Sequence, residues 1–182
     1  VPRHVARLFL VLAAHVAVLI RRQEEAVALE ELQGVPLGRV VAGGDDDAAD
    51  GVAYVIEDDQ YRVGILTDLG HPFDGLRDVL NSLDAVVLES NYDETLLENG
   101  SYPEFLKRRI RGPGGHLSNL EAARLIHHYA GQKLQWVCLC HLSGENNRPG
   151  VAREAAAELP DLGVRVHVAL RTEASPTFVL ED

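Results

Sequence analysis

The sequence predicts a layered α/β domain. From Gly51 onward, short apolar runs alternate with stretches whose hydrophobic residues follow helical spacing, and this strand–helix–strand order is typical of the class. The chain has 182 residues, which favours a single domain. Its composition, 46% hydrophobic and 25% charged, is that of an ordinary globular protein, and the sequence has no internal repeat.

An apolar run, Leu8–Ile20, lies between arginines near the start of the chain. It is too short to span a bilayer as a helix, so we expect no membrane association. A secretory signal is the alternative, but arginines and glutamates follow where a small-residue cleavage site would stand. We expect a buried or amphipathic helix here, followed by an acidic helix over residues 23–34 that Gly34 and Pro36 end.

Turn and capping signals divide the rest of the chain into elements. Residues 58–60 separate two β-type runs and indicate a hairpin, while Ser118 or Asn119 is a suitable N-cap for the helix that follows. The strands expected are 52–57, 61–67, 85–88, 134–139, 164–170 and 177–180. The helices expected are 72–83, 93–98, 102–110, 118–129 and 148–158.

The overall charge limits the possible partners. The net charge is −11 and the isoelectric point is about 5.1, so nucleic acid would be repelled unless a local basic patch or metal ions intervene. The two cysteines, Cys138 and Cys140, would lie on the same face of one strand, which suits a reduced, cytoplasmic protein. They could form a metal clip with His141, but a pair of small core residues is the favoured interpretation.

Four residues at element boundaries form a candidate site. Asp68, Glu89 and His141 follow apolar strands, and His116 precedes a helix. Ligands of open α/β sheets bind outside the carboxyl ends of strands, so we expect these side chains to converge in a metal or acid–base site. Asp68 and His141 suit Zn²⁺ or Mn²⁺, although Asp68 taken alone could be a turn residue.

The densest positive charge of the chain lies in residues 107–111. Lys107, Arg108 and Arg109 could contact a phosphate backbone, and a solvated helix face is the alternative.

Six blocks, in order, resemble a known family: D-D-A-A-D-G-V-A-Y-V-I-E (46–57), T-D-L-G (67–70), L-E-S-N-Y-D (88–93), G-S-Y-P-E-F-L-K-R-R-I (100–110), G-H-L-S-N-L-E-A-A (115–123) and C-H-L-S-G-E-N-N (140–147). They resemble the metallo-β-lactamase fold and, within it, the YycJ/WalJ-type bacterial metallohydrolases, over residues 46–182. The resemblance implies an αββα sandwich, a centre of two divalent metal ions (zinc or manganese), and phosphodiester hydrolysis by an exonuclease acting on DNA.

The resemblance also implies roles for the residues that match its motifs. Asp68 matches the aspartate that bridges the two metal ions, and His141 matches the last metal-binding histidine. His116 with Glu89 is similar to the histidine–glutamate pair of related nucleases, in which the histidine protonates the leaving oxygen. The substrate contacts expected from these blocks are Lys107, Arg108, Arg109, Ser143 and Asn146.

Two departures from the family pattern concern the metal ligands. The family's H-x-H-x-D-H motif, which supplies most of them, does not occur in residues 1–182, and Asp46 stands where the family has a histidine ligand. Asp46 can bind Mn²⁺ or Zn²⁺, but a carboxylate is not equivalent to an imidazole. We therefore predict weak binding with partial occupancy, below two ions per chain, and impaired catalysis.

Residues 1–45 form a divergent segment that does not resemble the family. We expect that residues 46–182 correspond to the C-terminal part of such an enzyme, with an incomplete sandwich, and that residues 1–45 come from a truncated or frame-shifted coding region. An incomplete sandwich would leave a sheet face uncovered and allow self-association. The alternative function is a non-catalytic remnant or interaction module.

Overall fold

The computed structural model describes residues 9–12, 16–19, 40–43, 51–57, 59–70, 72, 75–157 and 159–181. For 9–12, 16–19, 40–43 and 51–53 only the strand backbone is described. Asp46 and the helix expected over 23–34 lie outside the described residues. The division of the chain at residue 46 likewise stays a prediction.

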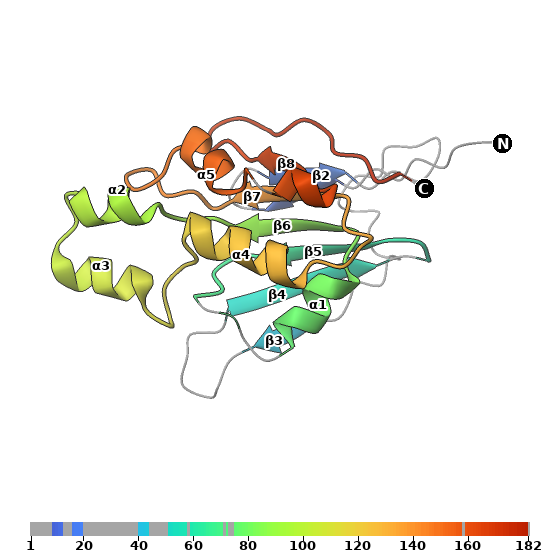
Figure 1. Ribbon diagram of the computed structural model, residues 1–182, viewed down its shortest axis with the longest axis horizontal. Coiled ribbons are helices and arrows are strands. Elements are labelled where there is room, and N and C mark those ends of the chain that lie inside the picture. Colours follow the sequence, from blue (N-terminus) through green and yellow to red (C-terminus); the bar gives the residue numbers. More distant parts are fainter. Residues whose placement is uncertain are drawn as a thin grey trace.

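A six-stranded mixed sheet organises the described chain, in the order β3-β4-β5-β6-β7-β8 (Figure 1). Its strands are β3 (Val40–Gly43), β4 (Gly51–Glu57), β5 (Arg62–Leu66), β6 (Ala85–Glu89), β7 (Trp136–Cys140) and β8 (Arg165–Val168). β3, β4 and β5 pair antiparallel, and β5 to β8 pair parallel. The residues that follow β5, β6 and β7 are therefore brought to the same edge of the sheet.

Three helices cover one face of this sheet: α1 (Leu76–Ser82), α4 (Asn119–Tyr129) and α5 (Pro149–Ala155), followed by a 3₁₀ helix at Leu159–Leu162. In Figure 1, α1 and α4 lie across the strands. Their buried side chains, such as Leu80 and Ile126, pack against Leu88 and Leu139 of the central strands. A layered α/β fold was the prediction from the sequence, and it is confirmed.

The opposite face of the sheet carries a second apolar cluster. Val87, Trp136 and Cys138 are buried there, together with Phe178 and Leu180 of the C-terminal segment. Residues 177–180 were expected to form a strand, and this expectation is wrong, because the segment crosses the sheet face as an extended chain and contributes no strand to the sheet. Its apolar residues produce the β-type pattern by packing on this face.

The run Leu8–Ile20 was expected to be a helix, and this expectation is also wrong. It forms two antiparallel strands, β1 (Phe9–Leu12) and β2 (Val16–Leu19), in a separate two-stranded sheet. Both strands contain valine, whose branched Cβ favours strand over helix. No helix of the described chain is long and apolar enough to cross a membrane.

Two short helices, α2 (Glu94–Asn99) and α3 (Glu104–Arg111), lie side by side at one end of the molecule (left in Figure 1). They fall where the sequence predicts them. Lys107 of α3 is only 6% exposed and its ammonium group donates to the carbonyl of Glu98 at 2.5 Å, which joins the two helices. Arg111 forms ion pairs with Glu94 and Glu98 at 3.2 and 2.7 Å across the same interface.

Candidate metal centre at the carboxyl ends of the parallel strands

The four residues singled out in the sequence meet at one point. Glu89 ends β6, His141 directly follows β7, and Asp68 lies two residues beyond β5, so the parallel pairing of these strands places all three at the same edge. His116 is in the loop before α4. One ligand atom from each of the four side chains lies within 4.8 Å of the others, as expected for a cation site.

Glu89 is the centre of this cluster and is fully buried. Its Oε1 atom lies 2.7 Å from Nδ1 of His116 and 2.8 Å from Nδ1 of His141. Its Oε2 atom accepts hydrogen bonds from the backbone N–H groups of Leu69, at 3.1 Å, and Leu117, at 3.4 Å. One carboxylate thus fixes two imidazole rings and two loops.

The electrostatics of the cluster favour an ionised Glu89. Burial alone would raise the pKa of Glu89, but the hydrogen bonds and charges of His116 and His141 outweigh burial and hold that pKa below its ordinary value. The hydrogen bond to Glu89 raises the pKa of His141, against the opposing effect of burial, and Asp68 adds to the rise. Asp68 is 61% exposed and lies 3.6 and 3.7 Å from the two Nδ1 atoms.

This arrangement determines what the two rings offer to a ligand. A neutral imidazole that donates its Nδ1–H to Glu89 has its Nε2 lone pair free for a cation, which is the usual role of a carboxylate behind a metal-binding histidine. A protonated imidazole instead has an Nε2–H to donate. Asp68, Glu89, His116 and His141 together form one cluster that could hold a cation, and carboxylate and imidazole donors suit Zn²⁺ or Mn²⁺. Among the described residues there is no second such cluster for another ion.

Unusual backbone geometry places two of the four side chains. Asp68 and His141 have φ angles of 55° and 57°, the left-handed region that aspartate and histidine tolerate better than most residues. Gly70 also has a positive φ, 61°, and an added Cβ would meet the carbonyl oxygen of Pro113 at 2.0 Å. The loop that carries Asp68 is therefore pressed against the loop that leads to His116.

A buried network of asparagines, which the sequence did not single out, supports the cluster. Asn147 donates to the carbonyls of Ser90 and Asn91 at 2.8 and 3.0 Å and exchanges hydrogen bonds with Asn119. Asn91 in turn donates to the carbonyl of His141 at 2.8 Å. The signal was present, because each of the blocks L-E-S-N, H-L-S-N and G-E-N-N carries an asparagine shortly after a site residue or its loop.

The expected substrate contacts do not share one environment. Arg108 and Arg109 are exposed, whereas Lys107 is buried and engaged between α2 and α3, away from solvent. Ser143 is half-buried and accepts a hydrogen bond from the backbone N–H of Asn146 at 3.1 Å. Asn146 itself is 1% exposed, so its side chain faces the interior. Of the five residues, the two arginines and Ser143 remain open to a ligand.

The cysteine pair takes no part in the cluster. Cys138 and Cys140 are free and buried, and burial raises the pKa of Cys138 to about 12. A thiol that resists deprotonation is a poor metal ligand, so the interpretation as a pair of core residues is confirmed. The cluster is thus built from carboxylates and imidazoles, which are common ligands of divalent metal ions.

Comparison with solved structures gives partial overlaps. The metallo-β-lactamase-fold protein YhfI from Bacillus subtilis overlaps 70% of this chain and 44% of its own, with a TM-score of 0.48 and 18% identity. A diphosphatase of the PhnP family overlaps 90% of this chain and 50% of its own, with a TM-score of 0.48 and 16% identity. No protein-family model matches the chain.

Sequence comparison identifies the relatives more directly. The chain is 32% identical over 113 residues to exodeoxyribonuclease YycJ of Bacillus anthracis and 35% identical over 114 residues to exodeoxyribonuclease WalJ of Streptococcus pneumoniae. The matches cover 62% and 61% of this chain but only 43% and 42% of these relatives. The predicted resemblance to YycJ/WalJ-type proteins is therefore confirmed, and the matches span less than half of the relatives' length.

Proposed function

We propose that the chain carries part of the active site of a metal-dependent hydrolase that cleaves phosphodiester bonds in DNA. The observation that carries this proposal is the single buried carboxylate, Glu89, that accepts from Nδ1 of both His116 and His141. The relatives named exodeoxyribonucleases supply the substrate class. Whether the chain is active by itself is a separate matter, because those relatives are more than twice as long as the matched segment.

Each residue of the cluster has a proposed role. Asp68 and His141 hold a divalent cation, which when bound polarises the phosphate and lowers the pKa of a water molecule. His116, oriented by the hydrogen bond of its Nδ1 atom to Glu89, protonates the leaving oxygen through Nε2–H in this proposal. Asp46 is the remaining candidate ligand. We propose occupancy below two Zn²⁺ or Mn²⁺ ions per chain, because the described residues offer donors for one ion.

A cytoplasmic location is part of the same proposal. Cys138 and Cys140 are free and buried in the same apolar cluster, an arrangement that needs no oxidising compartment.

The proposal is tested with labelled single- and double-stranded DNA and Mn²⁺, using the full 182-residue chain. We expect nucleotide release that His116→Ala reduces by about 100-fold or more, the usual contribution of a general acid. His127→Ala is the matched control, because His127 is an exposed histidine on α4 outside the cluster, and it should keep the wild-type rate. Equal rates for all three proteins would point to a contaminating nuclease and contradict the proposal.

Elemental analysis tests the occupancy. We expect fewer than two ions per chain and a further decrease in Asp68→Ala and His141→Ala. Two tightly held ions per chain would contradict the predicted partial occupancy. A chain that binds one ion but releases no nucleotides would support the non-catalytic alternative.

A further inference from the structure

The outer surface of α3 combines an exposed aromatic ring with unpaired positive charge. Phe105 is 68% exposed, whereas the other exposed large hydrophobic side chains of the described chain are 37–50% exposed. Arg108 and Arg109 follow at spacings i+3 and i+4, so all three residues lie on one helix face. Neither arginine forms an ion pair with a described residue, in contrast to Arg111.

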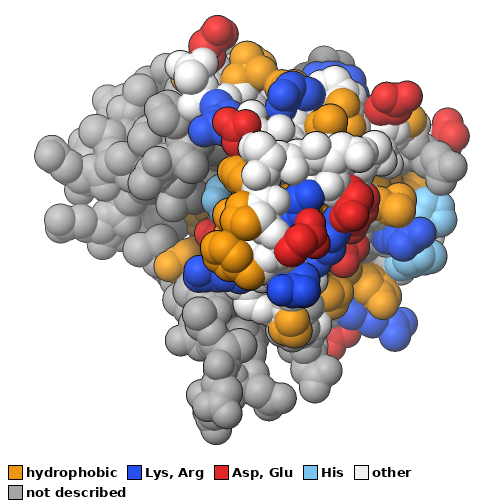
Figure 2. All heavy atoms as spheres, turned by 90° about the vertical axis from the view of Figure 1, so that its left-hand side faces the viewer, with side chains coloured by type: hydrophobic (Ala, Val, Ile, Leu, Met, Phe, Trp, Pro, Cys, Tyr) orange, Lys and Arg blue, Asp and Glu red, His pale blue; other side chains and the backbone are white. Residues whose placement is uncertain are grey.

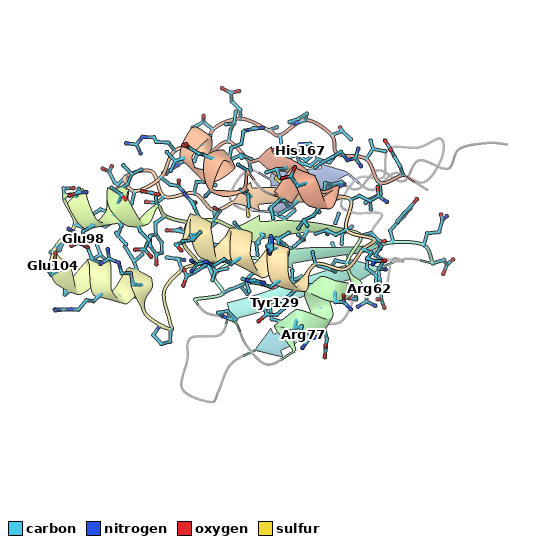
Figure 3. The ribbon with its side chains drawn as sticks, viewed as in Figure 1. Arg62, Arg77, Glu98, Glu104, Tyr129 and His167 are labelled. Carbon is cyan, nitrogen blue, oxygen red and sulfur yellow. The ribbon has the colours of Figure 1, made fainter. Side chains whose placement is uncertain are left out.

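The opposite side of α3 is fixed against α2. Lys107 points to the opposite side of α3 and donates to the carbonyl of Glu98, and it pairs with Glu104 at 3.4 Å. Figure 3 labels Glu98 and Glu104 close together at the outer end of the α2–α3 pair. Figure 2, which looks onto this end of the molecule, shows hydrophobic and basic side chains next to each other on its surface. The exposed face therefore belongs to a braced helix pair.

The same helix leads directly into the candidate active site. The carbonyl of Ile110 accepts a hydrogen bond from the backbone N–H of His116 at 2.9 Å. Phe105 lies five residues before Ile110, which is about 7.5 Å along a helix at about 1.5 Å per residue. A strand bound on α3 therefore lies on the helix whose carboxyl end is hydrogen-bonded to the backbone of His116.

We propose that this face of α3, made of Phe105, Arg108 and Arg109, is a binding site for single-stranded nucleic acid. Phe105 stacks on an unpaired base, and the two arginines contact the flanking phosphates. The inference rests on the proposed function, since it concerns the strand that reaches His116. A chain with a net charge of −11 repels nucleic acid overall, so binding requires a local concentration of basic groups such as this one.

A duplex would make less use of the same surface. Bases in a duplex are stacked on each other and cannot offer a face to Phe105, whereas the phosphates remain accessible to both arginines. The aromatic ring should therefore contribute to the affinity for single strands, and the arginines to the affinity for both forms of DNA. This difference separates base stacking from a general attraction of phosphates.

The test measures binding without hydrolysis, by fluorescence anisotropy of labelled DNA of about 16 nucleotides, single-stranded or duplex, with EDTA present. We expect Phe105→Ala and Phe105→Leu to weaken single-strand binding about 5-fold to 100-fold, the range for one stacked base, with little change for the duplex. Phe105→Trp should retain the affinity, and its added indole fluorescence should be quenched by the single strand. Arg109→Ala should lower the salt dependence of binding for both forms.

Two exposed residues far from α3 serve as controls. Leu162→Ala removes a half-exposed leucine of the 3₁₀ helix, and Arg77→Ala removes an exposed arginine of α1, at a distance from α3 (Figure 3). Both should bind as the wild type does. Equal affinities of the leucine and tryptophan variants at position 105 would overturn stacking, and so would an equal loss for single strand and duplex.

The remaining outcomes separate this inference from the proposed function. Binding that depends on Phe105, without hydrolysis in the Mn²⁺ assay, would support the non-catalytic alternative and leave this site standing. Hydrolysis that is indifferent to Phe105 and Arg109 would refute the site and leave the function standing. Self-association in sedimentation that Phe105→Ala abolishes, with unchanged DNA binding, would assign the face to a second copy of the chain and overturn the inference.

Discussion

Replacing the buried Asn147 by alanine should destabilise the protein more than replacing an exposed asparagine by alanine would. Its side chain is 3% exposed and has five polar partners within hydrogen-bond distance. The two hydrogens of the amide nitrogen are shared among three acceptors, the carbonyls of Ser90 and Asn91 and Oδ1 of Asn119, and the amide oxygen accepts from Nδ2 of Asn119 and from the backbone N–H of Arg148. These contacts link the loop after β7 to the residues that follow β6 and to the first residue of α4.

The expected cost follows from which partners lose their bonds. The carbonyl of Asn91 keeps a donor in Ser143, and Oδ1 of Asn119 keeps the hydroxyl of Ser90. In contrast, the carbonyl of Ser90 loses the donor described for it, and Nδ2 of Asn119 and the N–H of Arg148 lose the acceptor described for them. An unsatisfied buried donor costs about 1–3 kcal/mol, so Asn147→Ala should lower the free energy of unfolding by about 3–5 kcal/mol.

Urea unfolding of the metal-free chain, followed by circular dichroism, measures this difference. Asn147→Asp has nearly the same shape but would direct an oxygen at three acceptors, so it should cost at least as much as the alanine variant. Asn99→Ala is the matched control, because Asn99 is exposed and donates only to the carbonyl of Thr95, and it should cost less than about 1 kcal/mol. A loss below about 1 kcal/mol for Asn147→Ala would refute the claim that this network holds the site together.

Three further predictions use other parts of the described chain. Burial, together with two nearby arginines, lowers the pKa of His167 below 6.5 in the folded protein. The folded state therefore favours neutral His167, and the stability that this preference provides is complete above pH 6.5 and is lost as the pH falls through the folded-state pKa. His167→Phe should therefore lose less stability than the wild type between about pH 7.5 and pH 5, and His128→Phe, at an exposed site, should behave as the wild type. Lys107→Met removes the charged hydrogen bond between α2 and α3 and should cost about 2 kcal/mol in urea unfolding. Gly70→Ala should cost about 2 kcal/mol or more and weaken metal binding, because its Cβ meets a backbone carbonyl, whereas Gly114→Ala, in open space, should be neutral in both measurements.

The elements around the sheet could be predicted because their signals are local. The hairpin of β4 and β5 follows from two β-type runs around a polar turn, and α4 begins with a capping box in which Ser118 and Glu121 exchange hydrogen bonds. The prediction of a helix over Leu8–Ile20 was wrong, because length and hydrophobicity do not distinguish a short helix from two strands. The prediction of a strand over residues 177–180 was wrong, because a segment that packs on a sheet face can show the same alternation of apolar side chains as a strand within the sheet.

The four residues of the site could be predicted because topology, not distance along the chain, decides where they meet. Parallel strands carry their carboxyl ends to one edge, so a polar residue after each strand is enough to predict convergence. The shared role of Glu89 could not be predicted, since nothing in the sequence indicates that one carboxylate oxygen faces two imidazoles. The burial of Lys107 was equally hidden, because a lysine in a basic run has the same appearance whether its ammonium group meets solvent or a helix carbonyl.

The asparagine network explains why these motifs come as blocks rather than as single residues. His141, a proposed metal ligand, has a positive φ of 57°. Asn91 donates to the carbonyl of His141, while its own carbonyl accepts from Asn147 and from the backbone N–H of Ser143. The backbone strain at His141 is thus offset by the hydrogen bond from Asn91, which belongs to another block, L-E-S-N-Y-D. The blocks that carry Glu89, His116 and His141 are therefore joined to one another by hydrogen bonds.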